Sequence, residues 1–230
     1  MKFIDKNREP ASLLRWKRQN REYKNILWKY LRSDVRSEIK KSLLDEQGHI
    51  CCYCCMRINS SNSQIEHLKP KASNKFPQNK FDYKDNLLAS CDGGSEYNKA
   101  NNTNVSHCGK KKKDWYNQDL LVSPLCQFCE EYFIFTSRGE ILPSTEESKK
   151  TKAVTTIRKL GLNAYDLRDY RKRAITSFIM NHPEFTTKTS SERNEAVQTL
   201  IRRLREKDNK HMFDEFCTTI ISVLKQYIEE

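Results

Sequence analysis

Apolar residues recur at helical spacing near the start of the chain, from residue 10 to residue 47. Pro10 suits a first helical turn, and Ser33 or Asp34 is placed to cap a second helix that Gly48 ends. The apolar positions are Leu13, Leu14, Trp16, Tyr23, Ile26, Leu27, Tyr30, Val35, Ile39, Leu43 and Leu44. The pattern therefore predicts an N-terminal helical region over residues 1–48.

The helical periodicity is lost between residues 49 and 116, where Cys, Asn, Gly, Ser and Lys are frequent and only short strand-like pieces remain. A loop-rich segment with few apolar residues cannot easily build its own core, so a bound metal is an economical way to hold it together. Residues 117–143 are predicted to be extended, and EYFIFTSRGEILP predicts a hairpin with TSRG as its turn. These segments define a central region over residues 49–143.

Helical periodicity returns after this hairpin, where Ser144 and Glu147 resemble a capping box at the start of a helix. Further helices are predicted over 164–181, 190–207 and 211–228. The sequence contains no internal repeat and no low-complexity tract. The expected fold class is α+β and mostly α, with a C-terminal helical region over residues 144–230.

The net charge of the chain indicates what class of partner it binds. Its 230 residues include 42 Lys and Arg against 30 Asp and Glu, a net charge of +12. Such a positive field favours nucleic acid as a partner over a merely soluble basic protein. No apolar run approaches the roughly 20 residues that cross a bilayer. The start MKFIDKNREP lacks an apolar signal-peptide core, so we expect a cytoplasmic protein with no membrane partner.

Nine cysteines are clustered in a way that indicates metal, because disulfides are rare in the cytosol. CCYCC contains two overlapping CxxC pairs, and a CxxC turn lets two thiolates converge on one ion. We expect a structural Zn²⁺ whose ligands are Cys51, Cys54, Cys91 and Cys108, since the last two bracket the loop-rich region. Cys52 with Cys55, or Cys126 with Cys129, are the competing pairs. Cys217, in an apolar helical stretch, is interpreted as a small buried hydrophobe.

Between these cysteines lie Glu66 and His67 in QIEHLKPKA, Asn86 in DNLLASC and His107 in SHCGKKKK. The order CxxC, Glu-His-x-x-Pro, Asn-Leu-Leu-x-x-Cys and His-Cys resembles HNH nucleases, which have a ββα-metal fold and a four-cysteine zinc site. The resemblance implies that Glu66 binds a catalytic divalent ion and that His67 is the general base. It also implies that Asn86 holds the loop that orients this base, and that His107 is the last ligand of the ion.

The match departs from the family pattern at this last ligand, which usually follows the second downstream cysteine directly, as in C-H-x-x-K. Here Gly109 follows the cysteine and His107 precedes it. His107 therefore either binds the ion by a shifted route or only orients phosphate. Three asparagines remain as substitutes for it: Asn101, Asn102 and Asn104.

Phosphodiester hydrolysis makes sense of these residue types. A neutral histidine accepts a proton from the attacking water. One Mg²⁺ or Mn²⁺ neutralises charge on the transition state and on the departing oxygen. The lysines expected to contact flanking phosphates are Lys69, Lys71, Lys111 and Lys112.

A narrower resemblance runs over residues 49–178. HICCYCCMRI, IEHLKPKA, PLCQFCEEYFIFTSRGEILP and AVTTIRKLGLNAYDLRDYRKRAI together are similar to the HNH component of Septu-type antiphage systems, the PtuB family. That family implies a defence complex with a P-loop ATPase of the AAA/ABC type (PtuA-like), joined in some systems by a retron reverse transcriptase with its RNA and DNA. The chain has no GxxxxGKS loop, so any ATP dependence would come from the partner.

Three functions fit the sequence, and an endonuclease that cuts DNA is favoured. An RNase, for example one that cuts tRNA, would use the same residues, because this type of centre contacts mainly phosphates. The third function is a non-catalytic zinc module that binds nucleic acid or protein. The C-terminal helices either dock to the ATPase, with Arg202, Arg203 and Arg205 exposed, or form a plain stabilising bundle.

Overall fold

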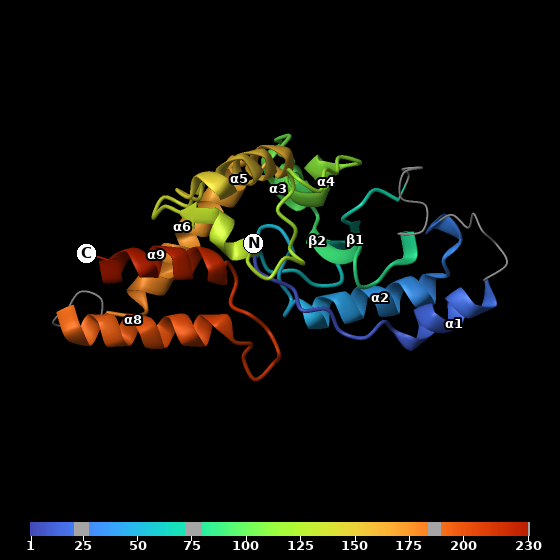
Figure 1. Ribbon diagram of the computed structural model, residues 1–230, viewed down its shortest axis with the longest axis horizontal. Coiled ribbons are helices and arrows are strands. Elements are labelled where there is room, and N and C mark those ends of the chain that lie inside the picture. Colours follow the sequence, from blue (N-terminus) through green and yellow to red (C-terminus); the bar gives the residue numbers. More distant parts are fainter. Residues whose placement is uncertain (21–27, 72–79, 184–189, 230) are drawn as a thin grey trace.

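The computed structural model describes residues 1–20, 28–71, 80–183 and 190–229. It consists mostly of helices around two small sheets (Figure 1), which confirms the expected α+β, mostly α, class. The first elements are α1 (Ala11–Gln19), η1 (Trp28–Tyr30), α2 (Ser33–Glu46), β1 (Ser63–His67), β2 (Leu87–Cys91), α3 (Ser95–Asn101) and α4 (Cys108–Lys112). They are followed by η3 (Cys129–Tyr132), β3 (Phe133–Phe135), β4 (Ile141–Pro143), α5 (Glu147–Leu160), α6 (Tyr165–Met180), α8 (Ser190–Arg205) and α9 (Cys217–Glu229).

The N-terminal helical pattern forms two separate helices. Leu13 and Trp16 are the buried residues of α1, whereas Leu14 on the same helix is exposed. Helix α2 begins at Ser33 with Arg32 at its N-cap and no side-chain cap, so the predicted cap by Ser33 or Asp34 is wrong. The helix ends before Gly48, whose φ of +57° leaves the helical region, as the sequence predicted. The apolar residues predicted at 23, 26 and 27 lie outside the described residues.

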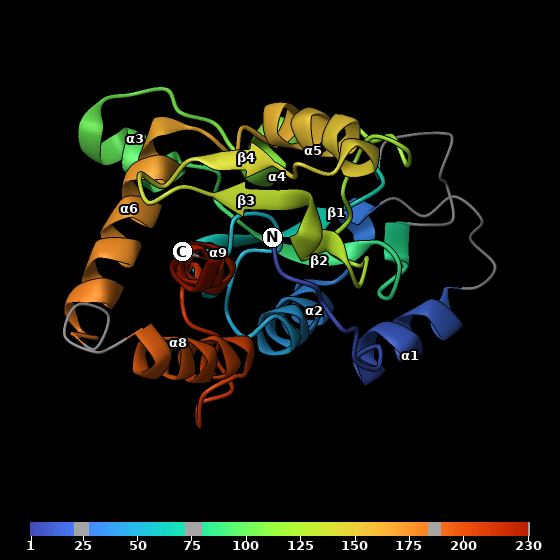
Figure 2. The same cartoon turned by 60° about the vertical axis from the view of Figure 1, so that its left-hand side comes forward.

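The central sheet pairs β1 with β2 in an antiparallel register that runs from Ser63 opposite Cys91 to His67 opposite Leu87. All five residues of β2 are buried, because this strand contacts both α2 and α4. Figure 2 shows α2 and α4 on opposite sides of this sheet. The last residues of β1 therefore lie between the core and the short helix α4, which begins at Cys108.

The predicted hairpin is present. Strands β3 and β4 are antiparallel, with Phe133 opposite Pro143 and Phe135 opposite Ile141. Its turn is closed by a hydrogen bond from the Thr136 amide to the Glu140 carbonyl at 3.0 Å, and Gly139 adopts a φ of +80° there. The composition of TSRG was sufficient to place this turn.

The capping box predicted after the hairpin is wrong. Helix α5 begins at Glu147, and the residue that precedes it, Glu146, makes no side-chain cap. The hydroxyl of Ser144 accepts instead from the amide of Glu146 at 3.3 Å, so it closes a local turn before the helix.

The last predicted helix starts six residues later than expected, at Cys217. The Asp208 carboxylate accepts hydrogen bonds from the amides of Lys210 and Met212, and Phe216 has a φ of +54°. These local bonds give the backbone an alternative to helix before α9. Helix α8 carries the three exposed arginines that the sequence predicted, Arg202, Arg203 and Arg205.

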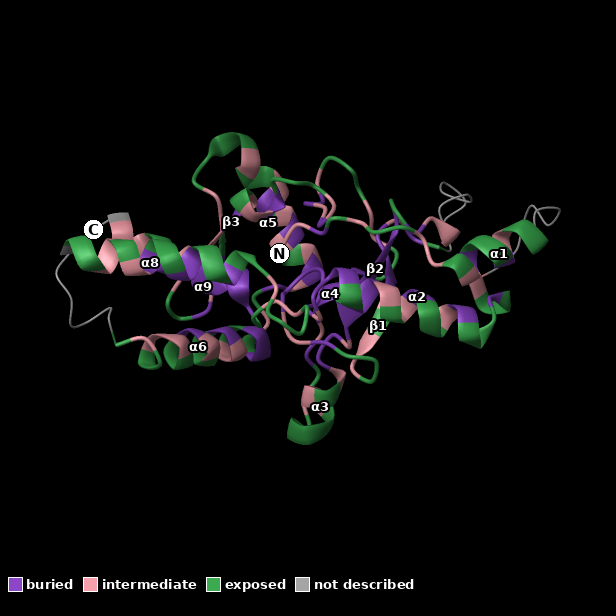
Figure 3. Cartoon of the chain, turned by 90° about the horizontal axis from the view of Figure 1, so that it is seen from below, coloured by how far each residue is buried: buried purple, intermediate pink, exposed green. Residues whose placement is uncertain are grey.

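Two apolar clusters hold the fold together. The larger one runs from Met1 to Leu167 and contains α1, α2, the β1–β2 sheet and the hairpin. The smaller one joins α8 and α9 to Ile50 and Cys55, so the C-terminal helices pack on the cysteine-rich turn. Cys217 is fully buried in it, which confirms its interpretation as a buried small residue. Figure 3 shows the buried residues concentrated around β2, α4 and the α8–α9 contact.

In the described ranges, none of the helices is both long and apolar enough to reach across a bilayer.

Candidate functional site

Four cysteines meet beside the β1–β2 sheet. Cys51 and Cys54 come from the turn after α2, Cys91 ends β2, and Cys108 begins α4. Their sulfur atoms all lie within 4.8 Å of one another, and Sγ of Cys54 is 3.9 Å from Sγ of Cys91. Sulfur ligands at about 2.3 Å from a tetrahedral zinc lie about 3.8 Å apart. The geometry and the all-sulfur donor set therefore suit a structural Zn²⁺, and these are the four residues that the sequence singled out.

The competing cysteine pairs do not belong to this cluster, although the Cys52 thiol lies beside that of Cys51. Cys55 lies against α9, with its sulfur 3.5 Å from Oγ1 of Thr218. Cys126 is exposed on the surface, whereas Cys129 is buried in the larger apolar cluster. Within the described residues, no second cysteine cluster forms around them.

His107 belongs to the neighbourhood of the cysteines. Its Nδ1 lies 3.4 Å from Sγ of Cys108 and 3.7 Å from Sγ of Cys91, and its Nε2 lies 3.1 Å from Oδ2 of Asp166. Both the imidazole and the Asp166 carboxylate are buried. A carboxylate that holds the outer nitrogen of a histidine beside a metal site fixes the orientation of that histidine. This pair also connects α6 to the start of α4.

Glu66, on β1, lies beside the last residue of α4, Lys112. Its Oε1 accepts a hydrogen bond from the Tyr53 hydroxyl at 3.1 Å and pairs with the ammonium of Lys112 at 2.9 Å. Burial raises the pKa of Glu66, and the charge of Lys112 opposes this shift. The carboxylate is therefore a buried group whose charge is balanced within the chain.

Lys112 was predicted to contact phosphate, but its ammonium is buried as well. It donates to the carbonyl of His67 at 2.9 Å in addition to its pairing with Glu66. The neighbouring Lys111 and Lys71 are exposed, and Lys69 is partly exposed. Three of the four predicted phosphate-binding lysines thus remain accessible to a ligand.

His67 ends β1 and is 7% exposed. Its Nε2 lies 3.1 Å from the carbonyl oxygen of Lys80, and its ring meets Trp28 edge-on at 4.5 Å between centroids. Phe81 in turn stacks on Trp28. Because a carbonyl only accepts, Nε2 carries the ring hydrogen and Nδ1 keeps the lone pair. His67 is thus oriented with Nδ1 as its basic nitrogen.

Burial and the charges of Lys71 and Lys112 lower the pKa of His67 to about 4, against a smaller opposing effect of its bond to Lys80. The imidazole is consequently neutral at pH 7, the state that a general base requires.

Asn86 fixes the segment that follows His67. Its fully buried side chain accepts from the amide of Lys69 and donates to the Lys69 carbonyl at 3.2 Å. Its own carbonyl accepts from the amide of Leu68 at 2.9 Å. The chain direction after the histidine is therefore set by the asparagine to which the family resemblance gives that role.

The catalytic divalent ion that the resemblance implies finds no ready set of ligands. Among the residues that the structure describes, only the four-cysteine cluster brings three or more Cys, His, Asp or Glu ligand atoms together. Gly109 offers no side chain, and a Cβ at that position would overlap Oε2 of Glu66. Because Glu66 is already paired with Lys112, the side chains as they lie do not fit a divalent ion.

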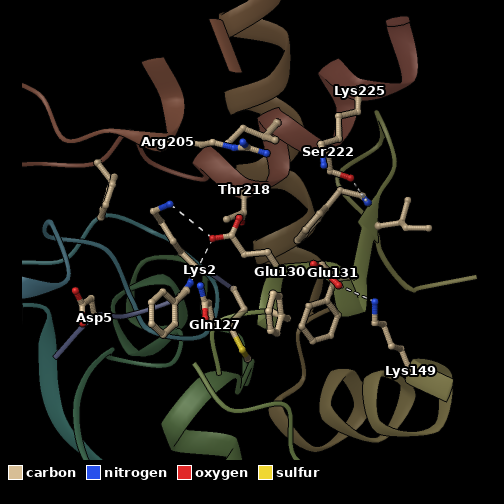
Figure 4. Close-up of a pocket in the computed structure, with 18 of the residues that line it drawn as sticks. Lys2, Asp5, Gln127, Glu130, Glu131, Lys149, Arg205, Thr218, Ser222 and Lys225 are labelled. Atoms are coloured by element: carbon tan, nitrogen blue, oxygen red, sulfur yellow. Dashed lines mark hydrogen bonds and ion pairs between the residues drawn. The ribbon is translucent and has the colours of Figure 1, made fainter. Parts of the chain in front are cut away.

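A sizeable cavity in the described part of the chain lies away from these residues. It measures about 1000 Å³ and is enclosed by the N-terminal segment, the β3–β4 hairpin and α9 (Figure 4). Its polar lining includes Lys2, Glu130, Arg205, Thr218, Ser222 and Lys225. Neither Glu66 nor His67 lines it, so the position of the candidate active site rests on its residues and their contacts.

Comparison with known proteins identifies the family. No family model matches the chain. A protein of Vibrio cholerae serotype O1 biovar El Tor, named as the candidate HNH endonuclease of retron Vc95, is 33% identical over 148 residues. The match covers 63% of this chain and 67% of that protein. The chain belongs to the HNH endonuclease family.

As an HNH endonuclease, the protein is a nuclease, and the structure places its candidate residues in two groups. Glu66, His67, Asn86 and Lys112 meet around the end of β1, whereas His107 joins the cysteines. Sequence reasoning missed Tyr53, Asp166 and Trp28. Tyr53 lies inside CCYCC and Asp166 inside NAYDLRD, but nothing in these strings shows that their side chains reach Glu66 and His107.

Proposed function

We propose that this HNH endonuclease hydrolyses phosphodiester bonds of nucleic acid, with DNA as the favoured substrate, at the end of β1. In this proposal β1, β2 and α4 form the ββα-metal core, and the four cysteines hold a structural Zn²⁺. The observation that carries the assignment is the geometry of His67, whose Nε2 is engaged by a carbonyl while Nδ1 remains basic. Asn86 supports this assignment because it holds Leu68 and Lys69, the two residues that follow His67.

The chemistry assigned to these residues is a single displacement at phosphorus. Nδ1 of His67 accepts a proton from a water molecule, the water oxygen forms a new bond to phosphorus, and the bond to the 3′ oxygen breaks. The 3′ oxygen leaves with the bonding electron pair and takes up a proton from solvent. Lys69, Lys71 and Lys111 are at least partly exposed, and the proposal assigns them to contacts with flanking phosphates. The family resemblance implies Mg²⁺ or Mn²⁺ at this site, although Glu66 is engaged with Lys112 in the arrangement described above.

We also propose that the nuclease is the effector of an antiphage defence complex. The named relative belongs to a retron, and the motifs over residues 49–178 resemble Septu nucleases. The partners proposed on this basis are a PtuA-like P-loop ATPase and a retron reverse transcriptase with its RNA and DNA. The absence of a phosphate loop from this sequence agrees with ATP hydrolysis by another subunit.

Cleavage assays with the wild type and a His67→Ala variant test the proposal. Supercoiled plasmid, linear duplex DNA and tRNA are incubated with each protein, alone and with the co-expressed ATPase, in Mg²⁺, Mn²⁺ or chelator. We expect the wild type to cut DNA and the variant to lose cleavage while it keeps its helical circular dichroism and its zinc. Cleavage of tRNA alone would support the RNase, and a folded His67→Ala protein that cuts at the wild-type rate would remove His67 from the mechanism.

A further inference from the structure

The ammonium of Lys112 is fully committed inside the protein. It lies 2.9 Å from Oε1 of Glu66, 2.9 Å from the His67 carbonyl and 3.3 Å from the Lys113 carbonyl. An ammonium has three N–H donors, so these three acceptors can use all of them. Its side chain is 1% exposed. Lys112 is therefore placed to neutralise Glu66 and to tie α4 to β1, and it is not placed to meet a substrate phosphate.

Helix α4 receives the Glu66 carboxylate along one face. Gly109 and Lys112 are three residues apart and so lie on the same side of the helix. Oε2 of Glu66 fills the space beside Gly109 that a Cβ would need, and Oε1 meets the ammonium of Lys112. Position 109 therefore carries no metal-binding side chain, and the charge opposite the carboxylate is supplied by Lys112.

A divalent ion and Lys112 compete for this carboxylate. Mg²⁺ and Mn²⁺ bind oxygen at about 2.0–2.2 Å. An ion bound to Oε1 would therefore stand no more than about 5 Å from Nζ of Lys112, which lies 2.9 Å from the same oxygen. At that separation in a buried site, two cations repel each other strongly.

We propose that Lys112 is the resident cation of the Glu66 site and that its ammonium keeps a divalent ion off this carboxylate. The proposal rests on the assignment of Glu66 to the hydrolytic centre, and it adds a position for Lys112 as the group that controls ion access. In this arrangement the Glu66 carboxylate is closed by a side chain of the same protein.

Mn²⁺ binding to the full-length, zinc-loaded protein tests this exchange without measuring cleavage. The rise in melting temperature is recorded against Mn²⁺ concentration for the wild type, Lys112→Met and Lys111→Met. Lys111→Met is the matched control, because it removes the same charge from an exposed position on the same helix. We expect Lys112→Met to melt lower than the wild type without Mn²⁺ and to be restored by it at a concentration at least roughly tenfold lower. Lys111→Met should follow the wild type.

Two further variants control for misfolding and for Mn²⁺ binding at other sites. Lys112→Gln keeps hydrogen-bond donors to Glu66 and to the His67 carbonyl, so it should fold even if Lys112→Met does not, and it should also bind Mn²⁺ at least roughly tenfold more tightly. Adding Glu66→Gln to either variant should abolish this response. Equal Mn²⁺ midpoints in the wild type and Lys112→Gln would overturn the proposal, as would a response that survives Glu66→Gln. A loss of cleavage in all variants bears on the proposed hydrolysis alone, since the Mn²⁺ midpoints are read independently.

Discussion

The two ends of α4 balance negative charge in different ways. At its start, Cys108 joins three other sulfur ligands that converge on one point, as a tetrahedral metal site requires. At its end, the ammonium of Lys112 neutralises the carboxylate of Glu66. A site that is preassembled for a metal suits a structural role. A site closed by a side chain of the same protein can exchange partners, which suits a role in catalysis.

Removal of zinc should have the largest effect on the first of these sites. A structural zinc contributes on the order of 10–16 kcal/mol of apparent free energy at neutral pH. This is comparable to the whole net stability of a typical domain, about 5–15 kcal/mol. We expect Cys51→Ser to lose zinc and to unfold, whereas Cys52→Ser, outside the cluster, should keep its zinc and lose only about 1–3 kcal/mol. Metal content by mass spectrometry and thermal unfolding measure both; full zinc content in Cys51→Ser would remove the cluster from its role.

The stability of the protein in acid should report on His67, whose carbonyl is bound by Lys112 at the end of α4. The unfolded chain protonates this histidine below about pH 6.5, and the folded chain does so only near pH 4. Its contribution to stability is therefore complete above about pH 6.5 and is lost as the pH falls from there through about 4. The loss amounts to roughly 3 kcal/mol. Denaturant unfolding at a series of pH values should show a shallower decline for His67→Gln than for the wild type; parallel curves would contradict the burial of a neutral imidazole.

The Asp166–His107 pair should couple α6 to the cysteine cluster with a smaller effect. Asp166→Asn keeps the size of the side chain but weakens a buried, charge-assisted hydrogen bond, at a cost of roughly 2 kcal/mol. Loss of such an outer partner typically lowers metal affinity by about 10–100-fold. Competition with a zinc chelator measures the affinity. Asp169→Asn, at an exposed pair on the same helix, is the control and should leave zinc binding unchanged; equal zinc affinity in both variants would place Asp166 outside the site.

The same contrast explains how far sequence reasoning reached. The four cysteines were identified because thiolate spacing and the loss of apolar periodicity are local properties of a sequence. The hairpin and α2 followed from turn residues and helical spacing for the same reason. The pairing of Lys112 with Glu66 was missed because it joins residues 46 positions apart, and a lysine in a basic run looks exposed. His107 was interpreted through a motif, but its place is decided by Asp166, which arrives from another part of the chain.

The smallest effect is expected at Lys111, and it separates the two kinds of lysine on α4. Its side chain is exposed, so Lys111→Gln should change the free energy of unfolding by less than about 0.5 kcal/mol. If Lys111 contacts a phosphate, the variant releases about one counterion fewer on binding, and the slope of log affinity against log salt should become shallower by about 0.9. Fluorescence anisotropy with a short duplex across a range of salt concentrations measures the slope. An unchanged slope would mean that this exposed side of α4 meets solvent or protein, and that nucleic acid approaches His67 from the side of Lys69 and Lys71.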